Sequence, residues 1–146
     1  MQNQINYKDV SNYILSLVEP DSGELISNLK MQKLLYYVQG FTLAMLDSPM
    51  FSEEIQHWTH GPVVPEAYHA FKNYNTSGIP TPSHLDFSMF SDKQMETMND
   101  VYNVYGQYSA WKLRQLTHEE LPWTCTKDNE VISHSLMKDF FKRQIH

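Results

Sequence analysis

Residues 27–74 constrain the fold of this chain more than any other stretch of its sequence. The first half is predicted to be a helix, because its apolar residues recur at the i, i+3, i+4 and i+7 spacing. Ser27 suits the N-cap of this helix, since its hydroxyl can accept from a free backbone N–H. A helix that is apolar on more than one side is expected to be the centre of a core. The periodic positions are Met31, Leu34, Leu35, Val38 and Met45, and the apolar face is widened by Phe41, Leu43, Ala44 and Leu46.

Gly40 lies inside this predicted helix. Glycine at such a position is less favourable than alanine by about 1 kcal/mol. We therefore expect a compensating contact, in which a neighbouring helix approaches so closely that a side chain at Gly40 would prevent it.

The second half of the stretch differs in pattern. Residues 55–60 mix apolar and polar side chains over a run too short for a helix, which favours an extended segment. A turn follows at Gly61-Pro62-Val63-Val64-Pro65, because each proline fixes its own φ and disfavours helix in the residue before it. Pro65 suits the first position of a new helix, whose predicted inner face is Ala67, Tyr68, Phe71 and Tyr74. Gly61 is expected to adopt a backbone conformation that other residues resist.

Helix-capping signals place further helices along the chain. Asn6 is the predicted cap of a helix over residues 7–18, and Ser91 with Gln94 forms a capping box before another helix that ends near Gly106. Later caps are predicted at Ser109, at Thr117 with Glu120, and near Ser133, whereas residues 20–23 and 75–82 are predicted to be a turn and a loop. The predicted architecture is mainly α: one compact bundle of about six helices over residues 1–146, with a small extended segment near residues 55–60.

Composition limits the classes of function. The formal net charge of −6 argues against direct nucleic-acid binding, which normally requires a basic face. No apolar run is long enough for a membrane span, and the first four residues contain no signal for secretion. Cys125 is the single cysteine, so no internal disulfide can form, which fits the reducing cytoplasm. We therefore expect a cytoplasmic protein without a membrane interaction.

Candidate catalytic residues are weak. The chain has seven histidines, but His57 and His60 lie three residues apart in an extended or turning segment, so their side chains are expected to point in different directions. Neither a metal site nor a cofactor site is expected, and Cys125 is interpreted as a small semi-buried residue. The acidic pair Glu119 and Glu120 is interpreted as solvated surface. The three tryptophans, Trp58, Trp111 and Trp123, are expected to lie in the core.

Three motifs resemble the Panacea domain family, which includes the SocA antitoxin and the GepA-like, phage-associated proteins. The motifs occur in the family's order, and the resemblance covers residues 7–141. Their sequences are Leu-Lys-Met-Gln-Lys-Leu-Leu-Tyr-Tyr from Leu29, Gly-Pro-Val-Val-Pro-Glu-Ala-Tyr from Gly61, and Tyr-Gly-Gln-Tyr-Ser-Ala-Trp-Lys-Leu from Tyr105 continuing into Thr-His-Glu-Glu-Leu-Pro-Trp from Thr117.

The resemblance implies a single Panacea-like antitoxin domain over residues 1–146, without enzymatic activity. Such a protein would neutralise a cognate protein toxin from an adjacent gene by direct binding, and the acidic net charge would favour a basic toxin. One alternative is an adaptor that delivers the toxin to a cytoplasmic protease. Another is a metal-dependent hydrolase that uses His57, His60, His118 and Glu119. The expected toxin-binding residues are Trp58, Gly61, Pro62, Val63, Val64, Pro65, Tyr68, His118, Glu119 and Trp123, together with the loop at residues 75–82.

Overall fold

A computed structural model describes residues 4–19, 21–74 and 77–145 of the chain. Within these ranges the fold is mainly helical, with seven α-helices, one short 3₁₀ helix and one two-stranded sheet. This confirms the predicted fold class. The elements in chain order are α1 (Tyr7–Ser16), α2 (Asn28–Leu46), β1 (Gln56–Trp58), β2 (Gly61–Val63), α3 (Pro65–Phe71), η1 (Lys72–Tyr74), α4 (Asp92–Tyr105), α5 (Ala110–His118), α6 (Leu121–Thr124) and α7 (His134–Lys142).

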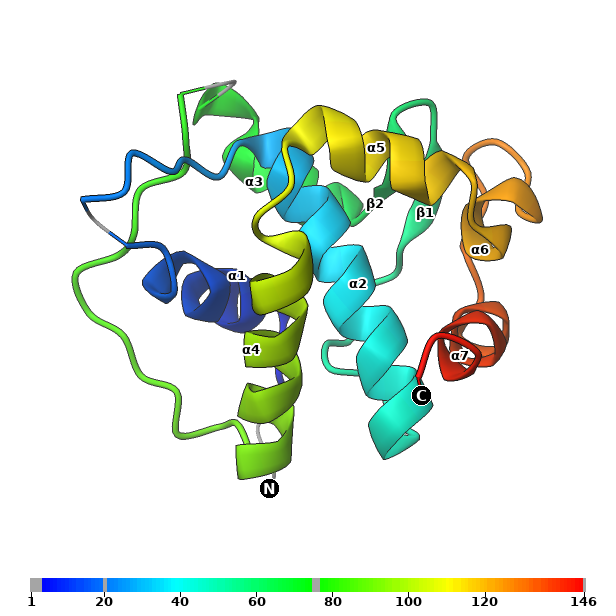
Figure 1. The fold of residues 1–146 in the computed structure, drawn as a ribbon, viewed down its shortest axis with the longest axis horizontal. Helices are drawn as coiled ribbons and strands as arrows, with labels where there is room; N and C mark the ends of the chain where they lie inside the picture. Colours follow the sequence, from blue (N-terminus) through cyan, green and yellow to red (C-terminus); the bar gives the residue numbers. More distant parts are fainter. Residues whose placement is uncertain (1–3, 20, 75–76, 146) are drawn as a thin grey trace.

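The predicted central helix is α2, which passes through the middle of the molecule (Figure 1). The Ser27 hydroxyl caps it by accepting from the backbone N–H of Lys30. Every residue from 30 to 40 is buried, because α1, α3, α4, α5, α7 and β2 all pack against this helix. None of the helices in the described ranges is long and apolar enough to cross a membrane.

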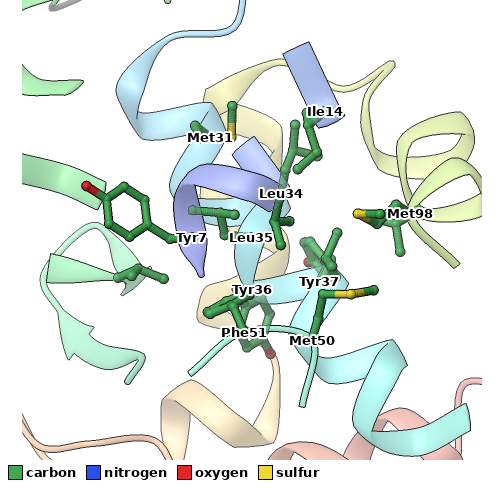
Figure 2. Close-up of a cluster of buried hydrophobic side chains, with 14 of the residues drawn as sticks. Tyr7, Ile14, Met31, Leu34, Leu35, Tyr36, Tyr37, Met50, Phe51 and Met98 are labelled. Atoms are coloured by element: carbon green, nitrogen blue, oxygen red, sulfur yellow. The ribbon is translucent and has the colours of Figure 1, made fainter. Parts of the chain in front are cut away.

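The core follows the apolar residues of α2. Leu34, Leu35, Tyr36 and Tyr37 are almost fully buried, and side chains from α1, α4 and the segment after α2 surround them (Figure 2). Phe141 of α7 packs edge-on against Tyr36, with ring centroids 5.4 Å apart. A Cβ added to Gly40 would overlap the Phe141 ring, so the expected close approach of a neighbouring helix is confirmed.

The extended segment expected near residues 55–60 is the first strand of a hairpin. β1 and β2 pair antiparallel, with Gln56 opposite Val63 and Trp58 opposite Gly61. The other edge of β1 is also covered, since the backbone N–H of His57 donates to the Glu130 carbonyl oxygen at 3.0 Å. Pro65 then occupies the first turn of α3, as predicted. The hairpin is thus held between α2 and the segment before α7.

Most of the predicted helix caps are confirmed. Asn6 and Ser91 form capping boxes at α1 and α4, and the hydroxyls of Ser109 and Ser133 accept from the first turns of α5 and α7. The box predicted at Thr117 is wrong. α5 continues through that residue to His118, and the Thr117 hydroxyl donates to a carbonyl oxygen of its own helix.

The predicted inner face of α3 is only half correct. Ala67 is buried and Phe71 is half-buried, whereas Tyr68 and Tyr74 are 37% and 39% exposed. The regular helix ends at Phe71 and the chain tightens into η1, so the periodicity does not extend to Tyr74. The predicted turn at residues 20–23 and loop at 75–82 lie partly outside the described residues. From Ser77 onward the chain returns along α1 and the start of α2, and the Ile79 N–H donates to the Ile26 carbonyl oxygen at 2.8 Å.

Candidate functional site

Buried polar groups on α2 hold the second strand of the hairpin. The Lys33 ammonium donates to the Pro62 carbonyl oxygen at 3.1 Å, and the Gln32 side-chain oxygen accepts from the Val64 N–H at 3.0 Å. Gly61 has a φ of +116°, and a Cβ there would lie 2.6 Å from the Lys33 side chain. The expectation that Gly61 takes a conformation unfavourable for other residues is therefore confirmed. The hairpin is fixed to α2 by both shape and hydrogen bonding.

Lys33 itself is a buried cation without a carboxylate partner among the described residues. Burial and, to a smaller extent, the nearby positive charge of Arg114 together lower the pKa of its ammonium to about 7. Both effects disfavour the charged form of Lys33. The interior beneath the hairpin therefore has an excess of positive charge when Lys33 is protonated.

A second buried polar cluster joins α2 to the start of α6. The two carboxylate oxygens of Glu120 accept from the hydroxyls of Tyr36 and Tyr37, each at 3.0 Å. Burial raises the pKa of the Glu120 carboxyl to about 7, although the two tyrosine hydrogen bonds act in the opposite direction. The interpretation of Glu119 and Glu120 as a solvated pair is thus correct for Glu119, which is exposed, and wrong for Glu120.

Trp123 of α6 joins the hairpin to α5 through contacts with one histidine from each. The ring of His57 lies 4.0 Å from the Trp123 ring and nearly parallel to it, and the His118 ring lies 4.1 Å away. The Trp123 indole N–H donates to the Trp58 carbonyl oxygen at 3.0 Å. His118 Nε2 lies 2.9 Å from the Thr59 carbonyl oxygen, so the hairpin tip is also held by α5.

This arrangement does not gather the residues of the hydrolase alternative into a metal site. His57 has backbone and carboxylate oxygens at its two nitrogens, 2.8 Å from the Trp123 carbonyl and 3.2 Å from Asp128. His60 lies in the turn between β1 and β2, Glu119 follows α5, and both are exposed. Throughout the described part of the chain, no group of three or more His, Cys, Asp or Glu side chains could hold a metal ion.

An open groove of about 920 Å³ lies on the other side of the hairpin, bounded by α2, α3, η1 and α5. Trp58 and Tyr68 form one part of its wall, packed edge-to-face with ring centroids 5.0 Å apart. Trp111 of α5 is 61% exposed and forms another part, so its expected place in the core is wrong. The groove is lined by Asn28, Leu29, Gln32, Trp58, Thr59, His60, Val63, Tyr68, Lys72, Asn73, Trp111, Arg114 and Asn129.

Arg114 lies at the border between the groove and the buried interior. Its guanidinium carbon is 4.9 Å from the centre of the Trp111 ring, a cation–π arrangement. Its Nε is buried and has no hydrogen-bond partner among the described residues. No carboxylate pairs with Arg114 among the described residues, so a negatively charged group in the groove could supply the missing partner of this cation.

The residues expected to bind a partner fall into two groups. Trp58, Val63 and Tyr68 line the groove. The others act behind it or beside it: Gly61, Pro62 and Val64 are buried, Pro65 begins α3, His118 and Trp123 support the hairpin, and Glu119 is exposed at the end of α5. The groove residues missed by the sequence analysis include Trp111, Arg114 and Lys72. The spacing of three residues between Trp111 and Arg114 indicates one helix face, but it does not indicate exposure.

Cys125 also differs from its interpretation as semi-buried, because it is exposed after α6. Its place at the end of a four-residue helix explains the exposure, since little of the chain packs over that turn.

Comparisons with known proteins identify the family. No solved structure matches the chain. An RNA-directed RNA polymerase of Nodamura virus (strain Mag115) is 30% identical over 102 residues, which cover 66% of this chain and 10% of the polymerase. The chain thus spans about a tenth of that relative's length, too small a share to transfer its activity. The family model for the antitoxin SocA-like, Panacea domain matches residues 31–124, from α2 through α6 and including most of the groove. The chain belongs to the SocA-like antitoxin family with a Panacea domain.

Proposed function

We propose that this protein is an antitoxin that neutralises a protein toxin, encoded by an adjacent gene, by binding it directly. Membership of the SocA-like antitoxin family is the observation that carries the proposal. It acts by binding rather than by catalysis, and it acts in the cytoplasm, where a single exposed thiol is compatible with reducing conditions. α1 and α7 lie outside the matched residues but pack against α2, so we include them in the same antitoxin domain.

The toxin-binding surface of this proposal is centred on the groove. Trp58, Tyr68 and Trp111 expose aromatic surface there, and aromatic side chains are the commonest anchors of protein interfaces. Val63 contributes to the floor, and Glu119 extends the surface along the end of α5. The buried residues of the hairpin contribute by fixing the position of Trp58, since they hold its strand on α2. A preformed surface on a rigid scaffold reduces the entropy lost on binding.

Co-expression with each neighbouring gene tests this proposal. We expect one neighbour to inhibit growth when expressed alone, growth to recover when this protein is co-expressed, and the two proteins to co-purify through a tag on either. Growth recovery without a physical complex would contradict direct neutralisation and favour the protease-adaptor alternative. Absence of toxicity from both neighbours would contradict the antitoxin function itself.

A further inference from the structure

The groove differs in charge from the rest of the chain. The chain contains 17 Asp and Glu against 11 Lys and Arg. The residues that line the groove nevertheless include Lys72 and Arg114 and not one Asp or Glu. In the described residues, neither Lys72 nor Arg114 forms an ion pair with a carboxylate. A net acidic protein thus presents this groove as a locally cationic surface.

The cation at Arg114 is positioned to receive an anion. Its guanidinium lies over the Trp111 ring, which restricts its orientation, and no carboxylate of the described chain pairs with it. Burial, followed by repulsion from Arg114, lowers the pKa of Lys33, a second basic group that lies close behind it. An anionic group beside Arg114 would accept from the guanidinium and would offset this repulsion as well.

The remaining groups in the groove suit a peptide backbone. Asn73 and Asn129 line the groove, and neither makes a side-chain hydrogen bond to another described residue. Each amide side chain can both donate and accept, which matches the N–H and C=O groups of an extended chain. A helix would satisfy most of these backbone groups within itself. The aromatic surfaces of Trp58, Tyr68 and Trp111 can accept the apolar side chains of such a segment.

We infer that the groove binds an extended, acidic segment of the partner protein, with carboxylates at Arg114 and Lys72 and apolar side chains against the tryptophans. The inference deepens the proposed function and rests on it, because the partner is the proposed toxin. The inference also refines the expectation of a basic toxin, which followed from the net charge of the chain alone. Whatever the toxin's net charge, the segment that enters the groove must carry negative charge. Single-stranded nucleic acid fits less well, because two fixed cations on a chain of net charge −6 are a small basic footprint.

Charge removal in the complex with the toxin is the first test. Arg114→Gln and Lys72→Gln are each expected to weaken toxin binding about tenfold, as for charged contacts in an interface, and to make the affinity less dependent on salt. Lys112→Gln is the matched control, because Lys112 is exposed on α5 but does not line the groove. Lys72 is exposed, so its substitution leaves the fold intact. The affinity of Lys72→Gln therefore tests the inference even where Arg114→Gln lowers the melting temperature. If the complex forms and both groove variants bind as the wild type does, this inference fails while the proposed function stands.

A second test does not involve the toxin. The probes are three short fluorescein-labelled peptides with leucine and glycine at the same positions. Their remaining positions are all Glu in one peptide, all Gln in the second and all Lys in the third. Fluorescence anisotropy measures the affinity of each peptide for the wild-type protein. The Glu peptide is expected to bind about tenfold more tightly than the Lys peptide, and the difference should disappear in the Lys72→Gln/Arg114→Gln double variant but not in Lys112→Gln. Equal affinity for the Glu and Lys peptides, or no binding of the Glu peptide, would overturn the inference. Tighter binding of a labelled oligothymidine than of the Glu peptide would also overturn it, and would assign the groove to nucleic acid.

Discussion

The two sides of the β1–β2 hairpin carry similar polar and basic residues in different roles. The inner side faces the buried part of α2, and the outer side faces the groove. On the inner side, Lys33 and Gln32 reach the backbone of the second strand. Their polar atoms therefore have partners within the chain. On the outer side, Arg114 has a buried nitrogen without a partner among the described residues, and Trp111 is mostly exposed. A buried basic group that holds the hairpin and a cation available to a partner thus lie on different sides of the same hairpin.

The difference shows how one short element can serve both stability and recognition. The inner contacts fix the backbone at Gly61 and Val64, so that Trp58 is held in place on the outer side. Substitutions on the inner side are expected to change the free energy of unfolding, and substitutions on the outer side are expected to change binding. A substitution that changes both the free energy of unfolding and the affinity for the partner would mark a residue that serves both stability and recognition.

The largest expected effect on the free energy of unfolding is at Leu35, in the buried core around α2. This side chain is fully buried in the centre of α2 (Figure 2), so Leu35→Ala should lower the free energy of unfolding by about 2–5 kcal/mol. The control is Met45→Ala on the same helix, where the side chain is 52% exposed, with an expected change within about 0.5 kcal/mol. Urea unfolding measures both, and similar values for the two variants would show that the buried face of α2 is wrongly assigned.

The next effect is at Gly61, where the comparison with Gly23 separates crowding from backbone strain. Both glycines have positive φ, +116° and +76°, but a Cβ would meet Lys33 at Gly61 and nothing within 4 Å at Gly23. Gly61→Ala should cost about 3 kcal/mol, near the upper limit for strained backbone, because the Lys33 side chain must also move. Gly23→Ala should cost about 1 kcal/mol. An unchanged melting temperature for Gly61→Ala would contradict the account of the hairpin.

A smaller effect concerns pH and the two buried ionisable groups. The pKa of Glu120 is raised from 4.5 to about 7 in the folded protein, so its contribution to stability is fully present below pH 4.5 and is lost as the pH rises through 7. The pKa of Lys33 is lowered from 10.5 to about 7, so its contribution is present above pH 10.5 and is lost as the pH falls towards 7. Together the two groups make the fold least stable near pH 7.

Variants isolate each group. In the wild type, titration of Glu120 should lower the free energy of unfolding by up to about 1.4 kcal/mol per pH unit between pH 4.5 and 7. This dependence on pH should be absent in Glu120→Gln. Lys33→Met should remove the corresponding increase between pH 7 and 10.5. Urea unfolding at a series of pH values measures the slopes. A slope that is the same in the wild type and in Glu120→Gln would mean that this carboxyl does not titrate in that range.

Local patterns predicted the inner side well and the outer side poorly. The periodicity of α2, its cap at Ser27 and the unusual backbone conformation of Gly61 depend on neighbouring residues, and all three are confirmed. The turn predicted from Gly61 to Pro65 is wrong, because Gly61–Val63 forms strand β2 and the chain reverses at Thr59 and His60. Glu120 follows another acid beside a short Leu-Pro-Trp helix, which is typical of surface. Its burial comes from Tyr36 and Tyr37, more than 80 residues away in the chain. Two tyrosines on a helix buried on all sides indicate that an acceptor must exist, but not which residue supplies it.

The groove could not be predicted for a related reason. Trp111 and Arg114 share one face of α5, and local sequence does not determine whether another element covers that face. In the structure the hairpin, α3 and η1 stop short of covering it, which leaves the open groove. Val63 and Tyr68 belong to the motif that begins at Gly61, whereas Trp58 and Lys72 belong to none of the three motifs, and Lys72 is found only through its place on η1.

The smallest expected effect on stability is at Trp111, and its effect on binding tests the central claim most directly. Trp111→Ala should change the free energy of unfolding by no more than about 0.5 kcal/mol, because the side chain is 61% exposed. The same substitution should weaken toxin binding by about 2 kcal/mol or more, roughly thirtyfold, as the loss of an aromatic anchor does. Val104→Ala is the control, since this residue is also exposed, at 48%, but lies on α4 away from the groove.

Isothermal titration of the purified toxin into the wild type, Trp111→Ala and Val104→Ala gives the decisive comparison, with a melting temperature recorded for each protein. The account predicts that Trp111→Ala loses affinity at an unchanged melting temperature, while Val104→Ala retains both. Wild-type affinity in Trp111→Ala would contradict the assignment of toxin binding to the groove.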